Sequence, residues 1–255
     1  MSGTGWLYGG LLLCSAACML LVDRRWRLAV FRTPRPALVT IALCVVVLLL
    51  WDLAGIGSGI FLCGAGPWQT GWLLARELPV EEVLFLTFLS HLPLVVDSAA
   101  TRLLGEGGRR ARVVELLPVL AVLVLVPGLV VSSQWHGGGA SLTYLVLDAA
   151  FLAPALVLAV LCGRGVGRSP GDPSTRATLA VLALLTAFFD SLLIHFGIIA
   201  YDWALTSGLR IGLAPLEDFA YIVLTAALAP VLLRRLGGAR HPHGAPMEVQ
   251  EGTRR

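Results

Sequence analysis

Seven long apolar runs constrain this chain more than any other feature of its sequence. Each is close to the roughly 20 residues that an α-helix needs to cross a bilayer. They are apolar on nearly every side, and a backbone in lipid must satisfy its own hydrogen bonds. The sequence therefore predicts an all-α integral membrane protein with seven transmembrane helices. The runs are Trp6–Val22, Ala37–Ala54, Val80–Ala100, Val113–Val131, Leu142–Cys162, Ala177–Ile199 and Leu213–Leu233.

Basic residues set the expected orientation of these helices. All 19 are arginines, and 17 of them follow the first, third, fifth and seventh runs. Only Arg76 and Arg210 lie in the alternate links. The positive-inside rule then places the N-terminus outside and the C-terminus in the cytoplasm, in what we expect to be a bacterial plasma membrane. Because anchoring to anionic headgroups accounts for the arginines, we expect no nucleic-acid partner.

A short acidic motif occurs twice, each time where a helix is expected to begin. Residues 79–85 read PVEEVLF and residues 215–221 read PLEDFAY. Proline suits the first helical turn, where the helix dipole favours an ionised carboxylate and burial favours a protonated one. Glu81, Glu82, Glu217 and Asp218 are therefore candidates for giving and taking a proton. The alternative is that these acids only cap helices at the membrane interface.

Aspartates within the apolar runs weaken the capping alternative. Asp52 lies 29 residues before Glu81, and Asp190 lies 27 residues before Glu217. Carboxylates at membrane depth usually have a function. Asp97 and Asp148 have no such counterparts and rank below these two.

The near-equal spacing predicts a duplicated chain. We expect a first three-helix repeat over residues 1–104, a linker helix over 105–135, a second repeat over 136–236 and a disordered cytoplasmic tail over 237–255. Because the first helix of the second unit comes four helices after that of the first, the repeats are expected to be parallel, related by an axis along the membrane normal.

Aromatic side chains accompany the acids. Phe85 and Tyr221 each lie four residues after a motif glutamate and share its helix face. Trp51, Phe189 and Tyr201 are further candidates for substrate contact, with packing as their alternative role.

Two histidines and one arginine near the predicted helices are expected to have structural partners. His91 and His195 are interpreted as hydrogen-bonded core residues, with proton relay as the alternative. Arg210 is expected to pair with Glu217 or Asp218. The five cysteines lack metal-site spacing and are interpreted as packing residues, so no metal is expected.

Together these residues resemble the membrane lycopene cyclase domain family. The resemblance rests on both acidic motifs, the paired Asp52 and Asp190, and the segments GLRIG at 208–212 and YDW at 201–203. In that family the two halves occur as separate subunits in many Gram-positive bacteria and as one fused chain in archaea and fungi. This chain is similar to the fused form as far as Leu236. Leu86 and Ala220 depart from the family pattern, which bears on substrate choice.

The resemblance implies a carotenoid cyclase, an intramolecular lyase or isomerase without a cofactor. A terminal double bond of lycopene, or of a related acyclic carotenoid, is protonated, a neighbouring double bond attacks, and proton loss leaves a β-type ring. The four motif acids would donate and accept the proton, while Asp52 and Asp190 orient them or stabilise the cation. No Gly-x-Gly-x-x-Gly motif follows a strand, so no dinucleotide is expected. The expected partners are the carotenoid, the bilayer and other enzymes of the pathway.

Two other classes of membrane protein do not fit the sequence, and two further functions stay open. A retinal protein needs a Schiff-base lysine, and the chain has none. A CAAX-type membrane protease needs an arginine where Leu86 stands. A proton-coupled transporter stays open, because buried carboxylates also suit it. A partner-dependent cyclase subunit stays open too, as do the ring type, the number of ends cyclised, the carotenoid length and the assignment of acid and base.

Overall fold

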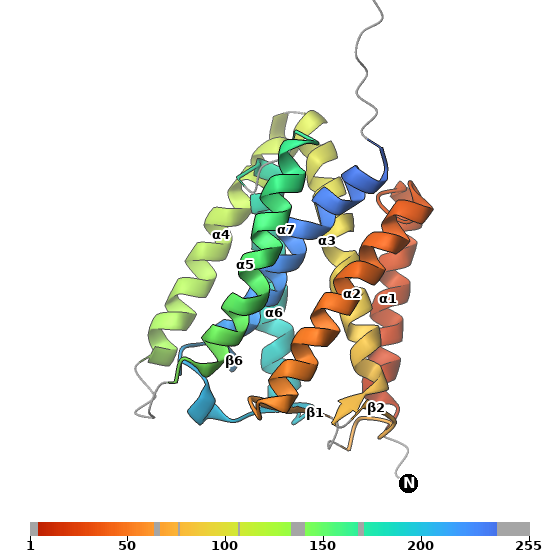
Figure 1. The fold of residues 1–255 in the computed structure, drawn as a ribbon. Helices are drawn as coiled ribbons and strands as arrows, with labels where there is room; N and C mark the ends of the chain where they lie inside the picture. The colour runs from red at the N-terminus through yellow and green to blue at the C-terminus, as the bar shows by residue number, and fades with distance from the viewer. Residues whose placement is uncertain are drawn as a thin grey trace, which may run out of the picture.

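The computed structural model describes residues 5–63, 67–75, 77–106, 108–133, 141–167 and 171–238. Within these ranges, seven α-helices lie side by side, and short strands gather at one end of the bundle (Figure 1). The helices are α1 Leu7–Trp26, α2 Pro34–Gly57, α3 Val80–Glu106, α4 Gly108–Ser133, α5 Thr143–Arg164, α6 Pro173–His195 and α7 Phe219–Leu236. Most of the predicted tail, residues 239–255, falls outside the described residues.

Among the described residues, six segments are long and apolar enough to cross a membrane. They are α1, α2, the Val80–Gly105 part of α3, α5, α6 and the segment Leu216–Leu236 that contains α7. The helical character expected from the sequence is confirmed, and these segments are compatible with a membrane protein. Since α4 is not among the six, the seven-span count stays a prediction.

The part of the chain that the structure describes also contains six short strands, which the hydropathy of the sequence did not predict. They are β1 Phe61–Cys63, β2 Leu73–Ala75, β3 Leu78–Pro79, β4 Ile199–Tyr201, β5 Arg210–Ile211 and β6 Ala214–Pro215. The pairs β2–β3 and β5–β6 are antiparallel hairpins that end on the prolines of the two acidic motifs, Pro79 and Pro215. Strand β1 pairs antiparallel with β4, with Leu62 opposite Ala200. This pairing ties the loop after α2 to the loop after α6.

Strand pairing corrects two predicted helix boundaries. The last helix does not begin at Leu213, because Gly212, with φ at +67°, turns the chain from β5 into β6. A 3-10 turn, η2 (Leu216–Asp218), then leads into α7. Similarly, the sixth helix ends at His195 and not at Ile199, because Ile199 pairs with β1.

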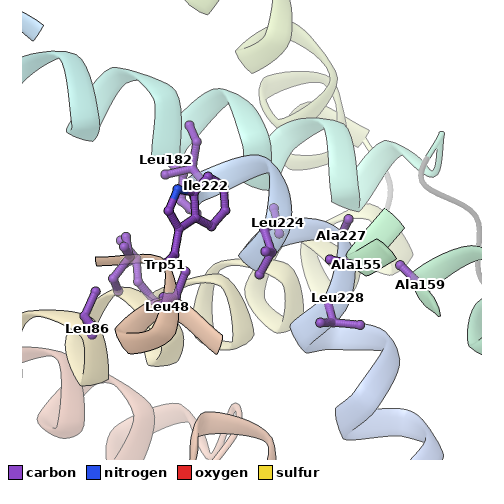
Figure 2. Close-up of a cluster of buried hydrophobic side chains, with 13 residues drawn as sticks. Leu48, Trp51, Leu86, Ala155, Ala159, Leu182, Ile222, Leu224, Ala227 and Leu228 are labelled. Carbon is purple, nitrogen blue, oxygen red and sulfur yellow. The ribbon is translucent and has the colours of Figure 1, made fainter. Parts of the chain in front are cut away.

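The core lies where five helices meet. Helix α7 packs against α2, α3, α5 and α6. Figure 2 shows part of this cluster, including Leu48 and Trp51 from α2, Leu182 from α6 and Ile222 from α7. Trp51 is fully buried and stacks between two rings, that of Tyr221 at 4.3 Å and that of Phe151 at 5.2 Å between centroids. The indole thus joins α2 to α5 and α7.

Asp23 fixes the link between α1 and α2 at the other end of the bundle. Its fully buried carboxylate accepts backbone N–H bonds from Leu28, Ala29 and Val30, at 2.9, 2.7 and 2.8 Å. His91 Nε2 lies 3.0 Å from Asp23 Oδ2, which ties this link to α3. His91 therefore has the predicted core role. His195 does not, because it is exposed at the end of α6.

We expect Asp23→Asn to destabilise the fold by about 2 kcal/mol, because a buried carboxylate acceptor is replaced while its backbone donors stay buried. Thermal unfolding in detergent measures this change. The control is Asp202→Asn, an exposed aspartate that accepts one N–H bond, from Ala204 at 3.0 Å. Equal melting temperatures for the two variants would contradict the role given to Asp23.

Candidate functional site: a cavity lined by carboxyl groups

Carboxyl groups from four elements line one cavity of about 60 Å³ at the strand end of the bundle. Asp52 comes from α2, Glu82 from α3, Asp190 from α6 and Asp218 from η2. The cavity is therefore shared between the two halves of the chain. The remaining lining residues are Phe61, Phe85, Leu89, Tyr144, Thr186, Ile199, Tyr201, Tyr221 and Ile222.

The two acids of each motif have different surroundings. Glu81 Oε1 accepts hydrogen bonds from the backbone N and from Oγ1 of Thr70, at 2.8 and 2.6 Å. Glu217 Oε1 accepts one from the backbone N of Ser207, at 2.5 Å. Adjacent residues on a helix point about 100° apart, so the second acid of each motif turns elsewhere, into the cavity. The first acid holds the preceding loop.

Three tyrosines donate to the cavity carboxylates. Asp218 accepts from Tyr144 on Oδ1 at 2.8 Å and from Tyr201 on Oδ2 at 2.7 Å. Asp52 Oδ1 accepts from Tyr221 at 2.7 Å. Both oxygens of Asp218 therefore act as acceptors, as an ionised carboxylate does. The cavity holds three of the four tyrosines in the chain.

Tyr201 stays a donor over a wide pH range. It lies in β4, outside the long apolar helices. Burial raises the pKa of its phenol well above the ordinary value, and the charges of Asp218 and of the Tyr144 and Asp190 side chains raise it further. The Tyr201 hydroxyl is therefore protonated at neutral pH and able to donate to Asp218.

The predicted aromatic contacts divide into three groups. Phe85, Tyr201 and Tyr221 line the cavity. Trp51 lies behind Tyr221, against which it stacks. Phe189 is not brought to the cavity, because it is 47% exposed and packs edge-on against Phe188.

Tyr144 lines the cavity although no sequence pattern singled it out, whereas Asp148, ranked below the paired aspartates, lies outside the lining. Both lie on α5, four residues apart and therefore on one helix face. Asp148 is buried and interacts electrostatically with Glu217 and Asp218. Sequence position could have pointed to both residues, because they fall in the first turns of a run that is predicted to start at the same end of the membrane as the acidic motifs.

Arg210 and Asp97 occupy other surroundings. The guanidinium carbon of Arg210 lies 3.4 Å from the centroid of the Trp203 ring. Its pairing with Glu217 or Asp218 stays a prediction. Asp97 is buried in the second half of α3 and lines a different cavity at the opposite end.

Comparison with known proteins gives two relatives, both from Dietzia sp. (strain CQ4). The first, whose name describes one of the subunits of a C(50) carotenoid beta-cyclase, is 47% identical over 88 residues, which is 34% of this chain and 71% of that protein. The second is LbtBC, named as a C(50) beta-cyclic carotenoids biosynthesis protein, and it is 40% identical over 90 residues. That match covers 34% of this chain and 21% of LbtBC. No family model and no solved structure matches.

A double-mutant cycle tests the bond between Tyr144 and Asp218. We expect Tyr144→Phe to lower the free energy of unfolding by about 1 to 3 kcal/mol, because a buried carboxylate oxygen loses its donor. In an Asp218→Ala background the same change should cost almost nothing, since the acceptor is gone. Thermal unfolding of the four proteins gives the coupling energy. An equal cost in both backgrounds would mean that the phenol only fills space.

Proposed function

Because the chain belongs to the family of membrane carotenoid cyclases, we propose that it closes a ring on the end group of an acyclic carotenoid. The proposed reaction is the redox-neutral formation of a β-type ring on lycopene or on a longer acyclic carotenoid. The relatives, which are named for C(50) products, support testing both substrate lengths. Since the relatives match only part of this chain, its activity is assigned from the cavity.

One observation carries this proposal, namely that carboxyl groups, phenols and apolar rings line a single cavity. Ring closure needs an acid that protonates a terminal double bond, surroundings that stabilise the resulting cation, and a base. The cation is attacked by a neighbouring double bond, and loss of a different proton restores an alkene. One proton enters and one leaves, so the product is an isomer of the substrate. A buried carboxylate and aromatic ring faces both stabilise a cation.

Hydrogen bonding distinguishes the two motif acids in the cavity. Asp218 accepts a phenol on each oxygen, which favours its ionised form. Within the described residues no hydroxyl donates to Glu82, so nothing holds it as an anion in this way. We therefore assign proton donation to Glu82 and stabilisation of the cation to Asp218. Asp52, whose Oδ2 has no hydrogen-bond partner in the described structure, is assigned the final proton removal.

Substrate entry must widen the cavity. Its volume of about 60 Å³ is well below the roughly 150 Å³ of a cavity that binds benzene, and an isoprenoid end group is larger than benzene. Phe85 and Tyr221 lie on the lining and are only partly buried, so rotation of these rings is the smallest change that makes room. Burial of the apolar end group supplies the free energy for this change.

We also propose that the chain is a duplication with the boundaries predicted above. The order of helix, helix, strand, hairpin and helix occurs on both sides of α4. In this order α2, β1 and α3 of the first half correspond to α6, β4 and α7 of the second. The contact of α2 with α7 then matches the contact of α6 with α3, and β1 pairs with its counterpart β4. Because each half supplies two carboxyl groups to one cavity, the chain has one site that treats one substrate end at a time. By the positive-inside rule, this site lies at the outer side of the membrane.

A partner-dependent subunit is the second candidate function. It is favoured by the word subunit in the name of the first Dietzia relative. Expression with and without a neighbouring cyclase subunit separates the two, since the composite cavity supports activity from this chain alone.

We predict that Glu82→Gln and Asp218→Asn each lower cyclisation by about 100-fold or more, because each removes a group that acts in the transition state. The measurement is pigment analysis of hosts that accumulate lycopene or an acyclic C50 carotenoid. Glu77→Gln and Asp202→Asn are matched controls near the same end of the bundle, outside the cavity. Both controls should leave the pigments unchanged.

The products also report whether the chain has one site or two. With one composite site, either variant loses bicyclic and monocyclic product together. Monocyclic product that persists at near-normal amounts in both variants would show two independent sites. Wild-type pigments without any ring, even with a partner subunit present, would refute the cyclase.

A milder effect is expected for the loop-holding acids. Glu81→Gln and Glu217→Gln keep the oxygen that accepts from Thr70 or Ser207, so each should lower the initial rate measurably, by between about twofold and tenfold. Rates of the purified protein in detergent measure this. A loss as large as that of Glu82→Gln would place these acids in the chemistry, and unchanged rates for both would remove them from the site.

A further inference from the structure

A second cavity, of about 560 Å³, lies at the arginine-rich end of the bundle, opposite the carboxylate cavity. It is bounded by the α1–α2 link, the second half of α3 and the end of α7, which lie together at that end (Figure 1). This volume is within the range of small-molecule sites. Nothing in the proposed cyclisation uses it.

The cavity is basic. Arg32 comes from the α1–α2 link, Arg102 from α3 and Arg234 from α7. Thr33, Ser98 and Thr101 add hydroxyl groups to the lining, and Asp97 is the acidic residue among the lining side chains. With all four ionised, three arginines and one aspartate give a net charge of +2. Guanidinium groups and hydroxyls are the donors that proteins use for phosphate.

One of these arginines is held in place in advance. Arg102 Nη1 donates to the carbonyl oxygen of Trp26 at 2.6 Å, and Nη2 donates to that of Arg27 at 2.7 Å. A guanidinium has five N–H donors, so two bonds leave others for a ligand. A cation fixed this way loses little conformational entropy when an anion binds.

The floor of the same cavity is apolar. Leu28, Leu94, Pro230 and Leu233 line it, and Leu28 and Leu94 are almost fully buried. A ligand that fits both parts carries a phosphate beside an apolar chain. We propose that this cavity binds the phosphate group of an anionic phospholipid. A soluble phosphate ester shares the charged part of this chemistry and lacks the apolar part.

The test uses the full chain, purified and delipidated in detergent. Short-chain phosphatidylglycerol is titrated against it, with binding followed by thermal shift and native mass spectrometry. The variant Arg32→Gln/Arg234→Gln removes two charges and spares Arg102, whose bonds to α1 are structural. The matched control, Arg164→Gln/Arg176→Gln, removes two arginines from the same end outside the lining.

Wild type and control should bind the lipid alike, and the cavity variant about 30-fold more weakly, from a loss of roughly fivefold per arginine. Inorganic phosphate and phosphatidylcholine should give no comparable shift. Equal binding by all three proteins would overturn the proposal, leaving only general charge attraction. Saturation by inorganic phosphate at similar concentrations would assign the cavity to a soluble phosphate. Because the readout is binding, it is independent of whether the protein cyclises carotenoids.

Discussion

The rest of the structure depends on one constraint, which is that four carboxyl groups gather in one cavity between the two halves of the chain. Asp52, Glu82 and Asp218 are buried there, and Asp190 is half-buried. Removing an ionised carboxylate from water without partners costs several kcal/mol, so each group must find a donor or stay protonated. Asp218 finds two phenols and Asp52 finds one. These three bonds connect α2, α5, β4, η2 and α7, which makes the site part of the framework of the bundle.

The strands at this end follow from the same constraint. Each first motif acid holds a loop through a backbone N–H, and each loop ends in a hairpin that leads into the helix carrying the second acid. Pairing of β1 with β4 then joins the loops of the two halves. The halves are not equivalent in the cavity, because all three phenols come from the second one. Tyr144 and Tyr201 thereby give Asp218 two donors that Glu82 lacks, while Tyr221 donates to Asp52.

Much of this was predictable from the sequence, since hydropathy indicated the helices and the duplicated spacing pointed to Asp52, Asp190 and the four motif acids, of which Glu82 and Asp218 line the cavity. The sequence alone could not show which way each side chain points. Adjacent acids look alike in a motif, and only the position of Thr70 or Ser207 shows which one holds a loop. Phe189 was chosen for its place beside Asp190, yet one residue along a helix turns its ring outward. The hairpins were missed because two or three paired residues leave no periodic signal.

The origin of the protons tests the central claim, that cavity acids protonate the carotenoid, most directly. Purified protein is given an acyclic carotenoid, lycopene or its C50 analogue, in D₂O, and the product is examined by mass spectrometry. Proton-initiated closure predicts that the product carries one deuterium for each ring formed and otherwise has the composition of the substrate. The Glu82→Gln variant should form neither the ring nor the deuterated product. A cyclic product that carries no deuterium, or that has lost hydrogen relative to the substrate, would contradict the account.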